Sequence, residues 1–183
     1  MFLERTGRLE LRPPEAADAG AFAAMDADPE VMRYIGDGSV PPADPELMAA
    51  RIARARRSWQ ERGYGLASVL LRESGEVVGW VQLAPPLFLP EVLPAVEIGW
   101  RFRRDAWGHG YATEAARVLL RVGFEEAGLD RLLSIRHVEN ARSARVMEKL
   151  GLRLRFETAV PAGGPPVAVH ALTRAEWLSG PRV

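Results

Sequence analysis

The chain has 183 residues, 48% of them hydrophobic and 26% charged, which is enough for one compact domain with a substantial core. Its 24 basic and 24 acidic side chains balance, so no long-range field favours nucleic acid or an anionic membrane surface as a partner. The absence of cysteine excludes disulfides and thiol nucleophiles, and no stretch resembles a signal peptide or a membrane span. We therefore expect a cytoplasmic protein with a single domain over residues 1–183.

The first half of the chain predicts short strands and three helices. Leu9 and Leu11 alternate with charged residues in a strand that ends at two prolines. Helical spacing follows over 18–27, 28–34 and 45–62, and the arginine-rich face of the last helix is expected to be solvated. Apolar runs over 66–71 and 77–83 flank a Glu-Ser-Gly-Glu turn, which predicts a hairpin of two antiparallel strands.

The second half predicts strands that alternate with helices. A loop over 84–94 contains four prolines and precedes a strand over 96–102. The later elements are a helix over 111–127, a strand over 131–138, a helix over 140–150 that Asn140 caps, and strands over 152–158 and 167–172. This order predicts an α/β protein with a mixed sheet flanked by helices.

The most informative stretch is the turn 107–114, which lies between a predicted strand and a predicted helix and reads Trp-Gly-His-Gly-Tyr-Ala-Thr-Glu. Its glycines allow a sharp turn, so the amides of 108–112 can converge on an anion at the positive end of the helix. This favours a pyrophosphate cradle. An ordinary strand-to-helix turn can have the same letters, so the neighbouring motifs decide between the two interpretations.

Those neighbours resemble the GNAT acetyltransferases, and within them the branch of the Rim-type ribosomal-protein N-terminal acetyltransferases. The resemblance covers most of the chain and rests on motifs in the family's order: 6–12, 97–100, 107–115, 140–151 and 171–177. It implies a single GNAT-like α/β domain whose mixed, mostly antiparallel central sheet splays apart at the cofactor site. It also implies transfer of an acetyl group from acetyl-CoA (coenzyme A) to a primary amine, and many relatives are dimers, which makes a homodimer an expectation.

The resemblance assigns roles to individual residues. Backbone groups of 100–103 would pair with the pantetheine arm, the glycine turn would hold the phosphates, Asn140 would contact the arm, and the Ser143 hydroxyl would protonate the departing thiolate. The cofactor-binding residues implied in this way are Trp100, Phe102, Arg103, Gly108, His109, Gly110, Tyr111, Ala112, Thr113 and Asn140. The amine would attack directly in a ternary complex, with a protein N-terminus or a small-molecule amine as acceptor.

Glu97 is our candidate for the general base. Strand alternation puts Val96 and Ile98 on one face and Glu97 on the other, and a half-buried carboxylate can have its pKa raised enough to accept a proton from an ammonium. The alternative is a surface glutamate paired with an arginine such as Arg101.

Two positions depart from the general family pattern. Trp107 stands where most members have Arg or Gln, and Met147 stands where many relatives have the tyrosine that acts as general acid. The three histidines lack metal-binding spacing, so no metal is expected. A non-catalytic acyl-CoA-binding or regulatory module and a nucleotide-binding α/β protein stay as alternatives. The loops 36–45 and 84–94 are expected to shape the acceptor site.

Overall fold

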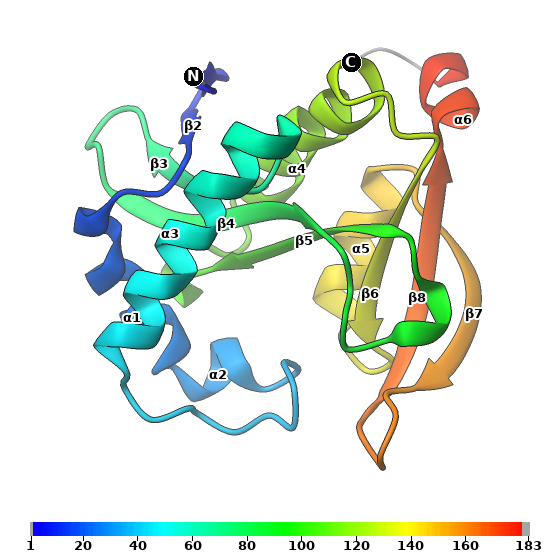
Figure 1. Ribbon diagram of the computed structural model, residues 1–183, viewed down its shortest axis with the longest axis horizontal. Helices are drawn as coiled ribbons and strands as arrows, with labels where there is room; N and C mark the ends of the chain where they lie inside the picture. The colour runs from blue at the N-terminus through cyan, green and yellow to red at the C-terminus, as the bar shows by residue number, and fades with distance from the viewer. Residues whose placement is uncertain (1, 181–183) are drawn as a thin grey trace.

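A central sheet crosses the molecule with the strand order β1-β2-β3-β4-β5-β6-β8-β7 (Figure 1). The computed structural model describes residues 2–180. Its strands are β1 (Glu4–Arg5), β2 (Leu9–Arg12), β3 (Leu66–Leu71), β4 (Val77–Ala84), β5 (Val96–Phe102), β6 (Arg131–His137), β7 (Arg153–Ala159) and β8 (Pro166–Thr173). Within the described residues β5 and β6 pair in parallel and the other neighbours pair antiparallel, which confirms the predicted mixed, mostly antiparallel sheet.

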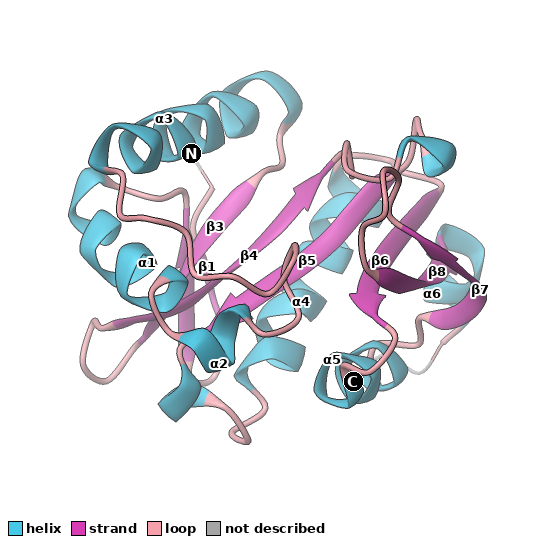
Figure 2. Cartoon of the chain, turned by 90° about the horizontal axis from the view of Figure 1, so that it is seen from below, coloured by secondary structure: helices cyan, strands magenta, loops and turns pink. Residues whose placement is uncertain are grey.

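The sheet splays between β5 and β6. Their parallel ladder consists of Val96 opposite Leu132 and Glu97 opposite Leu133, and then the two strands diverge. On the far side, β6 stays paired with β8 from Arg131 to His137. The divergence can be followed in Figure 2. The expected gap in the sheet is therefore present, and Glu97 lies at its apex.

Helices cover both faces of the sheet, as Figure 2 shows for α3 and α5. They are α1 (Ala19–Asp26), α2 (Pro29–Met32), α3 (Pro45–Arg62), α4 (Tyr111–Arg121), α5 (Ala141–Lys149) and α6 (Arg174–Ser179). The side chains of Asp28 and Asp44 accept hydrogen bonds of 2.9 Å from Glu30 N and Leu47 N, which caps α2 and α3. The bounds of α1, α2, α3 and α5 agree with the predicted helices to within two residues, whereas α6 was not predicted.

The helix predicted over 111–127 changes character after Arg121. It continues as a π-helical turn over Val122–Glu126. A Cβ at Gly123 would lie 2.9 Å from Leu132 Cδ1, closer than packed atoms approach. The glycine therefore allows this turn to pack directly on β6, beside the short ladder that joins β6 to β5.

Separate apolar clusters occupy the two faces. Under α4 and α5 the sheet packs residues that include Leu11, Ile98, Leu119 and Met147. Under α1 and α3 it packs a smaller cluster of Phe22, Met25, Val31, Ile52, Ala55, Leu66 and Trp80. Apolar burial on both faces holds the two halves of the splayed sheet in place. None of the helices within residues 2–180 combines the length and apolarity that crossing a bilayer requires.

The prediction that the arginine face of α3 is solvated needs one correction. Arg54 and Arg57 are exposed, but the side chain of Arg51 is only 20% exposed. Its Nη1 donates to Asp26 Oδ2 at 3.1 Å, and its guanidinium lies 4.9 Å from the centre of the Trp80 ring. An amphipathic pattern reflects only the polarity of residues along the helix, so it cannot show that Arg51 is partly buried by its ion pair with Asp26 of α1.

Candidate functional site

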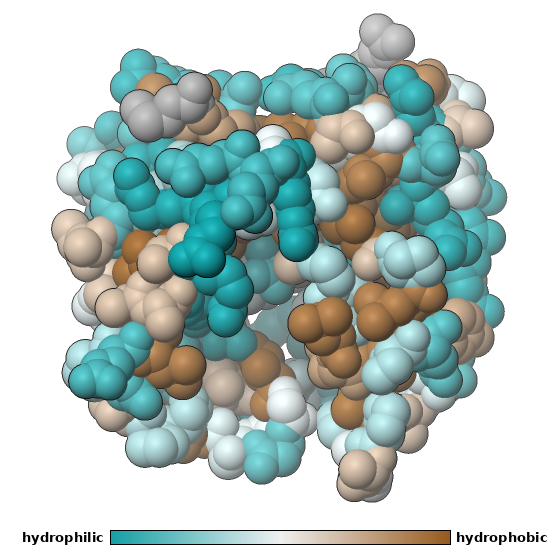
Figure 3. Space-filling model, viewed as in Figure 1, coloured by the Kyte–Doolittle hydropathy of each residue, from teal (hydrophilic) through white to brown (hydrophobic). Residues whose placement is uncertain are grey.

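A cavity of about 900 Å³ opens where β5 and β6 diverge. Figure 3 shows the molecule hollowed at this place, with hydrophilic side chains on the α3 side and hydrophobic ones on the side of the loop that follows β4. The volume lies within the range of sites that hold cofactor-sized ligands. The cavity joins the glycine turn and α5 on one side of the sheet to the loop after α2 on the other.

Most of the residues predicted from the sequence meet in this cavity. Those that line it are Glu97, Trp100, Phe102, Gly108, Gly110, Tyr111, Ala112, Thr113, Asn140 and Ser143. The two predicted loops also contribute, through Gly36 and Phe88. Arg103 and His109 do not line it, for reasons given below.

The glycine turn needs glycine at two positions. Gly108 and Gly110 have φ angles of 82° and 81°, in the left-handed region where other residues are strained. No backbone amide from Gly108 to Thr113 has an acceptor among residues 2–180. Several free N–H groups therefore point outward at the N-terminus of α4, next to the cavity, an arrangement that suits an anionic group.

The turn is fastened to the N-terminal segment by contacts that we did not predict. Arg8 Nη1 donates to the carbonyl of His109 at 2.9 Å, and Arg8 Nε donates to Glu114 Oε2 at 2.8 Å. Burial alone would raise the pKa of Glu114, but hydrogen bonds from Thr6 and Arg8 outweigh it and the pKa is lowered. Glu114 thus stays ionised, and His109 serves as an attachment point instead of lining the cavity.

The free edge of β5 faces the gap. Arg103 N donates to Val78 O at 3.0 Å, and Trp80 lies opposite Arg101. Because backbone groups of an antiparallel strand alternate in direction, those of Trp100 and Phe102 point away from β4 and toward the cavity. The amide and carbonyl of Trp100 and the amide of Phe102 can therefore meet a ligand, whereas the amide of Arg103 is already used.

Glu97 is placed as strand alternation predicted, but deeper. Its Oε1 accepts a hydrogen bond of 3.3 Å from Ile135 N across the apex of the splay. Burial of the carboxyl raises its pKa to about 8, and the bond from Ile135 offsets only part of this effect. The alternative pairing with Arg101 does not form, because Arg101 Nη1 contacts Asp26 instead. The carboxyl group is therefore free to exchange a proton near neutral pH.

The start of α5 forms the opposite wall of the gap. Asn140 Oδ1 accepts a hydrogen bond of 3.1 Å from Ser143 N and so caps the helix as predicted. The Ser143 hydroxyl has no hydrogen-bond partner within residues 2–180. Met147, which is 1% exposed, is buried one turn beyond it. A thioether therefore occupies the position where the family resemblance implies a tyrosine, and the Ser143 hydroxyl lies one turn before it.

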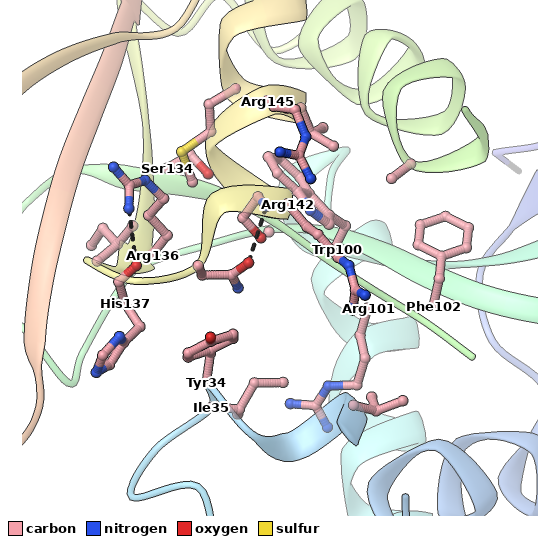
Figure 4. Close-up of a pocket in the computed structure, with 18 of the residues that line it drawn as sticks. Tyr34, Ile35, Trp100, Arg101, Phe102, Ser134, Arg136, His137, Arg142 and Arg145 are labelled. Atoms are coloured by element: carbon pink, nitrogen blue, oxygen red, sulfur yellow. Dashed lines mark hydrogen bonds between the residues drawn. The ribbon is translucent and has the colours of Figure 1, made fainter. Parts of the chain in front are cut away.

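Trp107 and Arg142 form a pair that the sequence did not reveal. The Arg142 guanidinium lies 4.4 Å from the centre of the Trp107 ring, and Trp107 Nε1 donates to Phe102 O at 2.9 Å. An arginine from α5 therefore stacks on the tryptophan that replaces the usual Arg or Gln. The Asn-Ala-Arg-Ser stretch predicts the start of a helix but does not indicate a role for its arginine. Figure 4 shows Arg142 and Arg145 projecting from α5 beside Trp100.

The histidines have separate environments. His137 lines the cavity and its ring lies 5.3 Å from that of Tyr34, a tyrosine that we had not considered. His170 is buried and accepts a hydrogen bond of 3.3 Å from Arg136 Nε, and its pKa is lowered by burial and by the charge of Arg136. Among residues 2–180 no three His, Asp or Glu side chains gather in a way that could hold a metal ion.

Comparison with known proteins identifies the family. Residues 8–153 match the family described as the acetyltransferase (GNAT) domain. FsC-acetyl coenzyme A-N(2)-transacetylase of Aspergillus fumigatus is 30% identical, over 94% of this chain and 77% of its own length. The uncharacterized N-acetyltransferase YnaD of Bacillus subtilis is 30% identical, over 94% of this chain and 97% of its own. The chain therefore belongs to the GNAT family of acetyltransferases.

Solved structures share the fold. A GNAT-family acetyltransferase from Bacillus anthracis superposes with a TM-score of 0.77 and 28% identity, over 96% of this chain and all of that one. A protein from Vibrio cholerae provisionally assigned as a ribosomal-protein-serine acetyltransferase superposes with a TM-score of 0.71 over 94% of this chain. The match covers 97% of the Vibrio cholerae chain, but the two sequences are only 20% identical, so the similarity supports the fold alone.

Proposed function

We propose that this protein transfers an acetyl group from acetyl-CoA to a primary amine by direct attack in a ternary complex. One observation supports this most: unpaired amides at the start of α4 and a carboxyl group with a raised pKa border the same cavity, on opposite sides of a gap in the sheet. Acetyl-CoA, when bound, supplies the activated acyl group. The chain's own residues must hold that donor, orient it and move two protons.

The glycine turn and β5 are the groups that would hold the donor. The free amides of Gly108 to Thr113 suit its diphosphate, and the unpaired backbone edge at Trp100 and Phe102 suits the amide-bearing pantetheine arm. The Phe102 amide would also polarise the thioester carbonyl. Asn140 keeps its side-chain nitrogen free for the arm while its oxygen caps α5.

Glu97 is the proposed base and Ser143 the proposed acid. With a pKa of about 8, the carboxylate of Glu97 binds a proton from an incoming ammonium more readily than an exposed glutamate would. The unpaired Ser143 hydroxyl lies on the other wall, where it can donate a hydrogen bond to the leaving thiolate. No metal and no covalent acyl-enzyme are needed in this scheme.

The names of two relatives, FsC-acetyl coenzyme A-N(2)-transacetylase and N-acetyltransferase YnaD, support an amine acceptor. The sequence motifs favour the Rim-type branch and therefore an α-amine as the acceptor. The Vibrio cholerae structure supports only the shared fold. We therefore propose Rim-type membership as the narrower assignment, with a protein N-terminus or a small molecule as the acceptor.

Glu97→Gln tests the base. The variant keeps the size of the side chain and its ability to accept from Ile135 N, so binding of acetyl-CoA should persist while kcat falls by roughly 100-fold or more. In the parent, kcat should rise with pH through about 8 as Glu97 ionises. Because the acceptor amine titrates equally in both proteins, only the parent should show this Glu97-dependent rise.

Glu157→Gln is the matched control, since Glu157 is exposed on β7 and does not line the cavity. An unchanged rate and pH profile in Glu97→Gln would remove Glu97 from the mechanism. The competing function, a non-catalytic acyl-CoA-binding module, predicts tight binding of acetyl-CoA with no release of coenzyme A on any amine. A preference for ATP or NAD over coenzyme A in calorimetry would contradict both functions.

A further inference from the structure

Two arginines share one aspartate beside the cavity. Arg51 from α3 and Arg101 from β5 both contact the carboxylate of Asp26, and both guanidiniums lie over Trp80, 4.9 Å and 5.2 Å from its ring centre. The side chains of Arg51, Arg101 and Asp26 are only 20%, 12% and 18% exposed. The cluster therefore keeps one uncompensated positive charge in a place where water solvates it poorly.

Burial and nearby charges act on Arg51 within this cluster. The pKa of Arg51 is lowered, first by burial and then by the like charges of Arg101 and Arg54, while Asp26 acts in the opposite direction. Glu30 on α2 and Arg33 just after it also border the cavity, but both are exposed and of opposite sign. Together they therefore do not compensate the excess positive charge of Arg51 and Arg101.

Arg101 is the member of the cluster that faces the cavity. It lines the cavity, whereas Arg51 does not. Its Nη1 donates to Asp26, but neither Nε nor Nη2 has an acceptor among the described residues. Figure 4 shows its side chain extending from β5 toward Ile35, on the side of the sheet opposite α5. Only one of the three guanidinium nitrogens of Arg101 therefore has a hydrogen-bond acceptor among the described residues.

Arg101 and Glu97 lie on the same face of β5. They are four positions apart, or about 13 Å between their Cα atoms at about 3.3 Å per residue. Gly99 lies between them without a side chain, and Gln82 is its partner across the strand pair. The Gln82 side chain lies 3.7 Å from where a Cβ of Gly99 would be, and Glu97, Gly99 and Arg101 all line the cavity. This part of β5 therefore connects the proposed base to the unsatisfied guanidinium, on the face from which an acceptor would approach.

We propose that the acceptor is a primary amine that also has a carboxylate, and that Arg101 binds this carboxylate while the amine reaches Glu97. This rests on the proposed function and narrows its acceptor to the amino-acid class. A carboxylate matches the planar fork of arginine, of which Asp26 occupies only Nη1, and it would neutralise the excess positive charge. The apolar side of the cavity mouth, which includes Phe88, would accommodate a hydrocarbon part of the acceptor (Figure 3).

Matched acids and amides test the proposal by calorimetry. 4-Aminobutyrate and 6-aminohexanoate, whose amine and carboxylate are held apart by a chain, are each titrated beside their carboxamides, so that amine and chain stay constant while the negative charge is removed. The protein is used with and without saturating coenzyme A, which binds like the donor but cannot react. We expect at least one acid to bind roughly 10- to 100-fold more tightly than its amide, the range for hydrogen bonds to a charged group.

Arg101→Gln should abolish this preference, and Arg51→Gln is the matched control. Both substitutions remove one ion pair to Asp26 and one cation above Trp80, but only Arg101 borders the cavity. Thermal unfolding checks that each variant folds. If Arg101→Gln does not fold, Arg101→Lys replaces it, since lysine keeps the charge near Asp26 but loses the fork, and should reduce the preference without abolishing it.

The proposal is overturned if no acid binds more tightly than its amide, or if Arg51→Gln and Arg101→Gln reduce the preference equally. These failures differ from failure of the proposed function. Turnover of amides and acids alike would remove the carboxylate requirement and leave the acetyltransferase intact. Absence of any coenzyme A binding would contradict the proposed function, while the titrations without coenzyme A would still compare acids with amides.

Discussion

Replacing Glu97 by Gln should stabilise the folded protein, by an amount that grows with pH. Burial raises the pKa of Glu97 to about 8 in the folded state, against 4.5 for an unperturbed glutamate. Between these two values the unfolded carboxyl is ionised while the folded one is protonated, so the folded state binds more protons. The stability of the parent therefore falls as pH rises through this window and levels off above about 8.

The magnitude follows from the two pKa values. A difference between 4.5 and about 8 corresponds to at most about 5 kcal/mol, at 1.36 kcal/mol per pH unit. Water entering the cavity would reduce this figure, because Glu97 borders it. Even half of it would be a large part of the ~5–15 kcal/mol that stabilises a typical domain. Glutamine carries no charge and still accepts from Ile135 N, so the variant should lack this penalty.

Urea denaturation of both proteins at pH 5, 6.5 and 8.5 measures the effect. Other groups also titrate in this range, such as His170 with its lowered pKa, but they are common to both proteins and cancel in the difference. The difference in free energy of unfolding should be small at pH 5 and largest at pH 8.5. A difference that does not change with pH would mean that the Glu97 carboxyl is fully hydrated, and the argument for a tuned base would fail.

Two further substitutions, one of them with a matched control, test the donor site and the proposed general acid. Gly110→Ala forces a left-handed backbone on a residue with a Cβ, so we expect a loss of about 1–2 kcal/mol in stability together with weaker binding of acetyl-CoA. Gly128→Ala has a similar φ of 66° with open space around it, and should lower stability but not affinity; equal affinities in the two variants would contradict the cradle. Ser143→Ala should lower kcat by roughly 100-fold or more without changing the Kd of acetyl-CoA, and an unchanged kcat would mean that the general acid lies elsewhere.

Local sequence signals located most of the fold. Hydrophobic periodicity and capping residues placed α3 and β5 at their observed bounds, since these signals act within one element. The sequence did not predict the π-helical turn over Val122–Glu126, where Gly123 packs closely on Leu132, because that packing involves another element. The two-residue strand β1 is too short to produce a pattern. The domain limits and the expected homodimer stay predictions.

The site was predictable only in part. Alternation gave the face on which Glu97 lies, and the glycine spacing gave the turn, because both are local properties. The bond from Arg8 to Glu114 joins residues 106 positions apart, and the sharing of Asp26 by Arg51 and Arg101 joins three elements. Such pairings depend on the packed arrangement of elements, which no local pattern contains.

The short ladder between β5 and β6 has a consequence for how the cavity could evolve. Only two residue pairs bridge the strands there, so the width of the opening depends on the packing of the core beneath it, through residues such as Ile98, Leu119 and Met147. A change of a methyl group in that core, far from any reacting atom, could widen or narrow the slot. Substrate range in this fold can therefore drift through interior substitutions that leave every cavity-facing side chain unchanged.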